Sequence, residues 1–165
     1  MAKILIVCNY DFAFNKFMIP FVNKLINMGH EVGVACDGDK FEHEKVVGKI
    51  TFYNVTMPRN ISLRGFFSCI YSLRKIIKNN SYDIVNSNNR NASFIARIAL
   101  MTLIFSKVKS AYTARGMYFH DNQNFFEYYL IYYVEIFLLF FTHIVLSQSE
   151  EDVKKLSRNI LVNSS

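Results

Sequence analysis

The chain has 165 residues, of which 52% are hydrophobic and 19% are charged. This length accommodates one ordinary domain with a hydrophobic core, and the composition excludes a chain that is mainly disordered. The formal net charge of +6 favours anionic neighbours such as phosphates, nucleic acids or an acidic membrane surface.

The first part of the chain predicts three strands. Residues 3–9 form a short apolar run that is typical of a buried parallel strand, and a polar loop follows it at residues 9–15. Apolar residues then recur at helical spacing over residues 17–28. Two more strands are predicted at residues 31–36 and 49–55, each after a turn or loop.

The second part of the chain continues the alternation. Phe66, Ile70, Leu73 and Ile77 have the spacing of one face of an amphipathic helix. The elements predicted after it are a strand at residues 82–87, a helix at 92–105, a strand at 109–116, a helix at 124–141 and a strand at 143–149. This alternation predicts an α/β fold with a doubly wound parallel sheet.

Polar segments follow three of the predicted strands. They read NYDFAFN, NSNNRN and ARGMYFHD, and ligands bind at the carboxyl ends of the strands in sheets of this kind. Arg90 and Arg115 lie in two of these segments, where a guanidinium can bind a phosphate or a carboxylate. The alternative for each is an arginine exposed to solvent in a loop.

Several other kinds of site lack support in the sequence. The loop after the first strand has no glycine, so a dinucleotide fingerprint is excluded, and no nucleophile elbow or metal-ligand spacing of histidines occurs. Cys8, Cys36 and Cys69 form no C-x-x-C pair. Cys8 and Cys36 fall in apolar strand-like runs, so we expect these two to be buried. A reducing cytoplasm fits, and no signal peptide precedes the first strand.

The predicted helix at residues 124–141 has two interpretations. It is very apolar, but it is short for a membrane span and contains Glu127 and Glu135. A buried or domain-packing helix is the first interpretation. The second is an aromatic surface that lies against lipid, with help from basic residues.

With these residues in view, the chain resembles the N-terminal half of bacterial family 4 glycosyltransferases. The resemblance runs through residues 3–39, DIVNSNNRNASFIARIA, YTARGMYFHDNQ and LSQSEEDVKKL, in order. It implies a Rossmann-like domain of a retaining GT-B enzyme that receives the acceptor. The nucleotide sugar would bind a second, C-terminal domain through a glutamate pair, and no such pair follows the last predicted element. No cofactor and no metal is implied.

The resemblance also implies roles for individual residues. Arg115 stands before Gly116 where relatives often have a histidine, and we expect it to stabilise the departing phosphate. Relatives often show histidines where this chain has Asn86 and Asn88. The residues expected to bind the acceptor or substrate are Asn9, Tyr10, Asp11, Asn88, Asn89, Arg90, Asn91 and Gly116.

These features predict one acceptor-side domain over residues 1–165, with the donor-binding domain absent. The expected function is transfer of a hexose-type sugar from a nucleotide sugar to a lipid-linked or polysaccharide acceptor, in the synthesis of lipopolysaccharide, O-antigen or capsule. We expect a cytoplasmic location, peripheral contact with the inner membrane face, and no activity from this chain alone. The alternative is a non-catalytic binding domain or remnant that pairs with a separate donor domain. Nucleic-acid binding rests on charge alone and is not expected.

Overall fold

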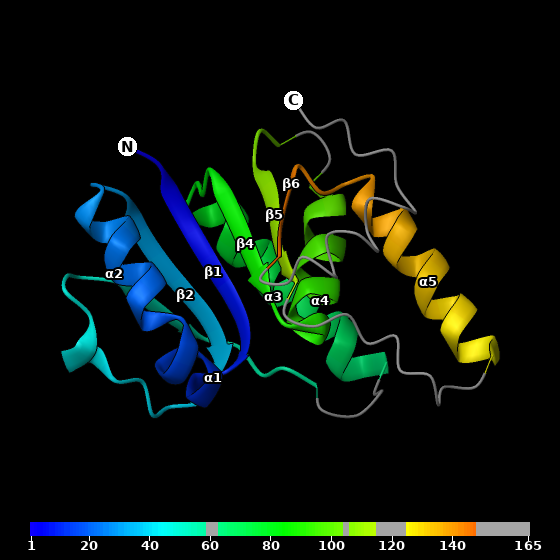
Figure 1. Ribbon diagram of the computed structural model, residues 1–165, viewed down its shortest axis with the longest axis horizontal. Helices are drawn as coiled ribbons and strands as arrows, with labels where there is room; N and C mark the ends of the chain where they lie inside the picture. Colours follow the sequence, from blue (N-terminus) through cyan, green and yellow to red (C-terminus); the bar gives the residue numbers. More distant parts are fainter. Residues whose placement is uncertain (59–62, 104–105, 115–124, 148–165) are drawn as a thin grey trace.

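A single parallel sheet organises the molecule (Figure 1). The computed structural model describes residues 1–58, 63–103, 106–114 and 125–147. The strands are β1 (Lys3–Tyr10), β2 (Glu31–Asp37), β3 (Thr51–Asn54), β4 (Ile84–Asn88), β5 (Lys109–Ala114) and β6 (Ile144–Ser147). They pair in parallel in the order β3-β2-β1-β4-β5-β6. The predicted doubly wound α/β fold is therefore confirmed.

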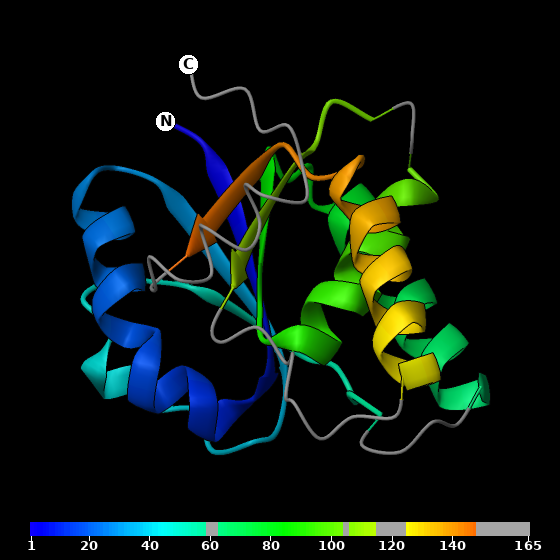
Figure 2. The same cartoon turned by 45° about the vertical axis from the view of Figure 1, so that its right-hand side comes forward.

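Helices lie on both faces of this sheet. They are α1 (Asp11–Phe17), α2 (Ile19–Asn27), α3 (Leu63–Asn79), α4 (Arg90–Met101) and α5 (Phe125–Leu139), with a short 3-10 helix at His43–Lys45. The helices α1 and α2 cover one face, and α3, α4 and α5 lie on the other (Figure 2). This arrangement follows from right-handed crossovers that run in opposite directions from β1.

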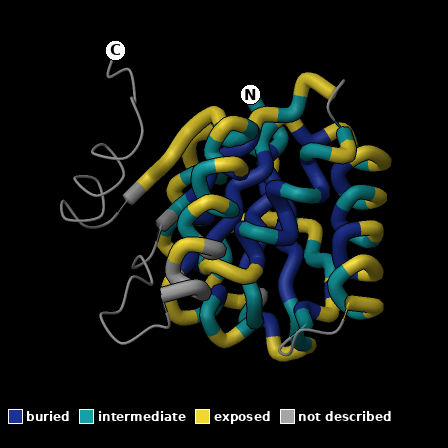
Figure 3. Tube along the Cα trace, turned by 90° about the vertical axis from the view of Figure 1, so that its right-hand side faces the viewer, coloured by how far each residue is buried: buried dark blue, intermediate teal, exposed yellow. Residues whose placement is uncertain are grey.

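The core has two parts because side chains of a strand alternate between the faces of the sheet. Ile4 and Ile6 pack with α1 and α2, whereas Leu5 and Val7 pack with α3 and α4. The central strands are accordingly the most buried part of the chain (Figure 3). Cys8 and Cys36 are buried free thiols, as predicted, and Cys69 on α3 is a buried free thiol as well.

Several helix boundaries differ from the prediction. Residues 11–15 were predicted as a loop, but they belong to α1, which begins directly after β1 and buries Phe14 completely. A second helix, α2, follows with Pro20 in its first turn, where the missing N–H is tolerated. The helix predicted from residue 92 begins earlier, at Arg90.

The helix α5 has both a packed side and an exposed side. Leu138 is buried, and Glu135 accepts two hydrogen bonds from Arg97 Nη2 at 2.9 and 3.0 Å. Tyr133, Phe137 and Phe140 are exposed. Among the residues described, no helix is long and apolar enough to cross a membrane.

Candidate substrate-binding edge

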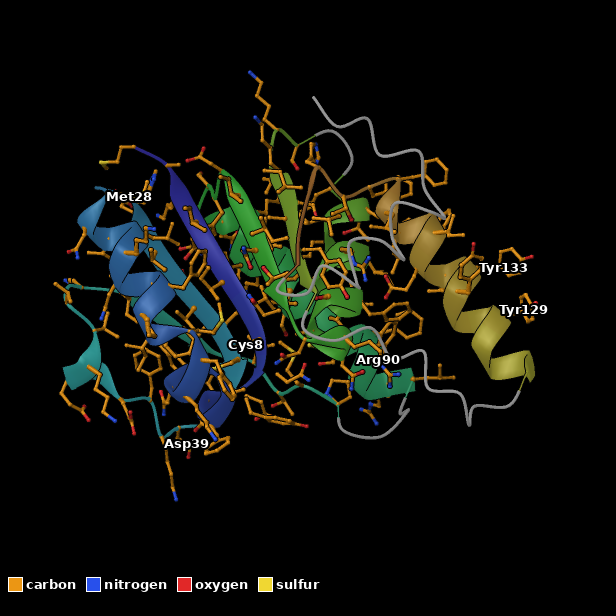
Figure 4. All side chains as sticks on the ribbon, in the orientation of Figure 1. Cys8, Met28, Asp39, Arg90, Tyr129 and Tyr133 are labelled. Atoms are coloured by element: carbon orange, nitrogen blue, oxygen red, sulfur yellow. The ribbon has the colours of Figure 1, made fainter. Side chains whose placement is uncertain are left out.

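The point where the chain changes direction across the sheet is between β1 and β4. Strands added after β1 extend the sheet on one side through β2 and β3, and on the other side through β4, β5 and β6. The crevice outside the carboxyl ends of β1 and β4 is the usual ligand site of such folds. Figure 4 shows Arg90 at this edge of the sheet, and Cys8, near the end of β1, lies toward the same edge.

A hydrogen bond joins the end of β1 to the helix that follows β4. Asn9 Oδ1 accepts a hydrogen bond from the backbone N–H of Ala92, at 2.9 Å, in the first turn of α4. The residue at the N-cap position, Asn89, makes no such side-chain bond to the helix. Asn9 therefore supplies from β1 the acceptor that a capping residue normally supplies locally.

The connection from β4 to α4 is tight and strained. Asn89 alone separates the strand from the helix, and its φ of 67° and ψ of 150° lie in a region that residues other than glycine rarely occupy. This conformation turns the chain sharply enough for α4 to start at the sheet edge. The predicted residues Asn89, Arg90 and Asn91 are thereby held beside the end of β1.

The first turn of α4 is electropositive. Arg90 is the first helical residue, its side chain is exposed, and no acidic residue occurs in that turn. Unpaired N–H groups give the amino end of a helix a partial positive charge, to which this guanidinium adds. The arrangement suits an anionic group such as a phosphate.

The carboxyl end of β4 is polar although it is buried. Asn86 Oδ1 accepts hydrogen bonds from Asn88 Nδ2 at 2.8 Å and from Thr113 Oγ1 at 3.2 Å. Asn88 is 1% exposed, and its Oδ1 has no hydrogen-bond partner among the described residues. A buried parallel strand is normally apolar, which makes this cluster unusual.

The roles of Asn86 and Thr113 were not predicted. The sequence marks Asn86 only as a position where relatives often have histidine, and it assigns no individual role to Thr113. The available signal was the spacing of Asn86 and Asn88, because residues two apart on a strand lie on the same face.

Asp11 holds the loop that follows β2. Its Oδ2 accepts a hydrogen bond from the backbone N–H of Lys40 at 2.9 Å, and its carboxylate lies against Gly38, where an added Cβ would collide with it. Gly38 has a φ of 132°, which also favours glycine. Asp11 and half-buried Tyr10 thus stand on the β1 side of the edge.

Two of the predicted site residues, Arg115 and Gly116, lie outside the described residues, so their roles stay predictions. In the part of the chain that the structure describes, no group of three or more His, Cys, Asp or Glu side chains could hold a metal ion.

The sequence of the chain is similar to those of known proteins. The family model described as "Glycosyl transferase 4-like" matches residues 3–149. The "Putative glycosyltransferase EpsD" of Bacillus subtilis (strain 168) is 28% identical over 153 residues, which make up 91% of this chain and 38% of that protein. The chain therefore spans well under half of this curated relative.

Solved structures share the fold. The S. aureus MnaA–UDP complex superposes with a TM-score of 0.72 at 14% identity, covering 99% of this chain and 42% of that one. A glycosyltransferase from Rickettsia africae ESF-5 gives a TM-score of 0.60 at 17% identity, covering 99% of this chain and 50% of that one.

Proposed function

The chain belongs to the glycosyl transferase 4-like family, and from this premise we propose that it is the acceptor-side domain of a sugar transferase. The enzyme would transfer a hexose-type sugar from a nucleotide sugar to a lipid-linked or polysaccharide acceptor in cell-surface glycan synthesis. The family match and the similarity to EpsD support transfer. The fold alone does not distinguish sugar transfer from epimerisation, since a UDP-N-acetylglucosamine 2-epimerase has the same fold.

The observation that carries the proposal is the Asn9–Ala92 hydrogen bond at the edge where the sheet changes direction. It brings together, at one crevice, two polar segments that the resemblance assigns to the acceptor. The amides of half-buried Asn89 and exposed Asn91 can donate to and accept from sugar hydroxyls. Arg90 can bind a diphosphate through paired N–H groups.

We assign the catalytic role to Arg115, which would stabilise negative charge on the departing phosphate of the donor. A guanidinium stays protonated at physiological pH, so this role differs from that of a neutral imidazole. Contributions from a second domain of the enzyme would complete the donor site. The charge of +6 is compatible with a peripheral location at an acidic membrane face.

The test is a transfer assay with the protein that contains this chain. Radiolabelled UDP-glucose, UDP-galactose, UDP-N-acetylglucosamine and GDP-mannose are each incubated with detergent-solubilised membrane lipids of the source cell. One donor is expected to label a lipid-linked or polysaccharide product. No product from any donor, or epimerisation of the donor instead, would contradict the proposal. An Arg115→Ala variant that transfers at the wild-type rate would remove Arg115 from the mechanism.

A further inference from the structure

The outer face of α3 carries large apolar side chains in solvent. The inner face is formed by Cys69, Ile70, Leu73 and Ile77, which are buried in the core. On the outer face, Leu63, Phe67 and Tyr71 are 70%, 64% and 66% exposed. They follow one another at intervals of four residues, so they form one line along the helix.

The same helix carries one basic residue in its first turn and three near its carboxyl end. Arg64, Arg74, Lys75 and Lys78 lie within it, and it contains no aspartate or glutamate. At about 100° per residue, these four residues and the apolar line fall within roughly 120° of the helix circumference. The outer face of α3 therefore combines exposed apolar groups with positive charge.

The exposed aromatic side of α5 differs in charge. Tyr129, Tyr133, Phe137 and Phe140 are exposed, but α5 contains no lysine or arginine. Tyr129 and Tyr133 extend away from the body of the molecule (Figure 4). Of these two helices, α3 is the one that offers the combination that binds an anionic lipid surface, namely apolar groups for the interface and cations for the phosphates.

The outer face of α3 also begins close to the candidate site. Phe66 of α3 packs on Phe94 of α4 with their ring centroids 5.5 Å apart. Phe94 lies one helical turn after Arg90, at the positive end of α4. A surface held on α3 would therefore lie beside the carboxyl edge of the sheet.

We propose that the outer face of α3 docks the protein on an anionic phospholipid bilayer. Leu63, Phe67 and Tyr71 enter the interfacial region, while the basic side chains reach lipid phosphates. This inference rests on the proposed function only in assuming that the edge beside α3 receives a lipid-linked acceptor. Binding to the bilayer itself needs neither donor nor acceptor.

The test is flotation of the purified protein with vesicles in the absence of any sugar. Vesicles of phosphatidylcholine alone are compared with vesicles containing one-third phosphatidylglycerol, at low and high NaCl. Wild-type protein is expected to float with the anionic vesicles at low salt only. The variants Phe67→Ser/Tyr71→Ser and Lys75→Gln/Lys78→Gln should each weaken this binding at least about tenfold.

Matched controls come from elsewhere on the surface. Tyr133→Ser/Phe137→Ser removes aromatic groups from α5, and Lys24→Gln/Lys49→Gln removes exposed lysines outside α3, and both should bind as wild type does. Equal binding to neutral vesicles, unchanged binding of the α3 variants, or loss only in the α5 variant would overturn the proposal. The proposal would also be overturned if wild type were a dimer and the α3 variants were monomers that still bound vesicles as wild type does.

Sugar transfer in detergent is measured in parallel, because no bilayer is present there. Transfer without vesicle binding would refute the docking surface and leave the proposed function standing. Vesicle binding without transfer from any donor would refute the proposed function and leave the docking surface standing. The α3 variants should keep the wild-type rate in detergent.

Discussion

At the sheet edge, Asn9 has a structural role in addition to the substrate-binding role that we predict for it. Asn9 was predicted to bind substrate, and the structure shows that its Oδ1 caps α4 through Ala92. The amide group still has its Nδ2 donors, so capping leaves it able to contact a ligand. A change at Asn9 should consequently affect both stability and substrate binding.

Asn9→Ala should lower the free energy of unfolding by about 0.5–2 kcal/mol, the usual cost of losing a helix cap. Chemical denaturation of the two proteins measures this difference. Asn9→Asp is the matched control, because a carboxylate also accepts from the Ala92 N–H and suits the positive end of a helix. If Asn9→Ala were as stable as wild type and Asn9→Asp were not, the capping role would be wrong.

The Cys69 thiol should make the folding stability depend on pH in the alkaline range. Burial, and secondarily the charge of Asp37, raises the pKa of the Cys69 thiol to about 11 from 9.0. The thiol is neutral in both states below about pH 9, but above that pH only the unfolded chain loses the proton. Folding stability should therefore fall between about pH 9 and pH 11, by up to about 3 kcal/mol.

Denaturation curves at pH 8, 9, 10 and 11 test this for wild type and Cys69→Ala. The variant lacks the thiol, so its stability should fall less over the same interval. Tyr82, whose pKa is also raised by burial, contributes equally in both proteins and cancels in the comparison. Parallel curves for the two proteins would show that Cys69 has no part in the pH dependence.

At the scale of elements, one ion pair ties α5 to α4. Arg97 is 1% exposed and donates hydrogen bonds to both carboxylate oxygens of Glu135. Its Cζ lies 4.4 Å from the centroid of the Tyr112 ring. Its Nε also donates to the Ser93 carbonyl oxygen at 3.1 Å. Removal of Glu135 would leave a buried guanidinium without its counter-charge.

Glu135→Ala should destabilise the protein by about 3 kcal/mol, at the low end for buried pairs because Glu135 remains partly exposed. The double variant Arg97→Met/Glu135→Leu should recover most of that loss, since no charge is then buried. Chemical denaturation measures both. A loss below about 0.5 kcal/mol for Glu135→Ala would show that the pair does not stabilise the packing of α5.

Element order was predictable from the sequence, but several contacts were not. Hydrophobic periodicity located all six strands because a buried parallel strand is a short apolar run. The helix α1 was missed because its sequence, DFAFNKF, is short and its single buried residue, Phe14, gives no periodic pattern. Its helical state depends on packing against the sheet.

The candidate site was predictable in position and less so in detail. Polar residues at strand ends placed Asn89, Arg90 and Asn91 at the carboxyl edge of the sheet, where the structure has them, because carboxyl ends of parallel strands share an edge. The Asn9–Ala92 bond links residues 83 positions apart, and the Arg97–Glu135 pair links two helices. Such contacts follow from tertiary packing, which local spacing does not encode.

At the scale of the whole molecule, the described part of the chain presents the candidate substrate-binding edge and the outer face of α3, which is both basic and apolar. The edge lies where the sheet changes direction, and the outer face of α3 begins beside it. The chain covers 38% to 50% of the relatives compared above. A second part of the enzyme would close over this edge to supply the donor, as we propose.

The proposal that the carboxyl edge at α4 binds the acceptor is tested most directly by kcat/KM for sugar transfer by Arg90→Gln. The donor is the one that the transfer assay above identifies. Loss of one charge-assisted contact to an anionic acceptor should lower kcat/KM about 10- to 100-fold. Lys24→Gln, which removes an exposed positive charge from α2, should stay within about twofold of wild type. If Arg90→Gln transferred as fast as Lys24→Gln, the carboxyl edge at α4 would not be the acceptor site.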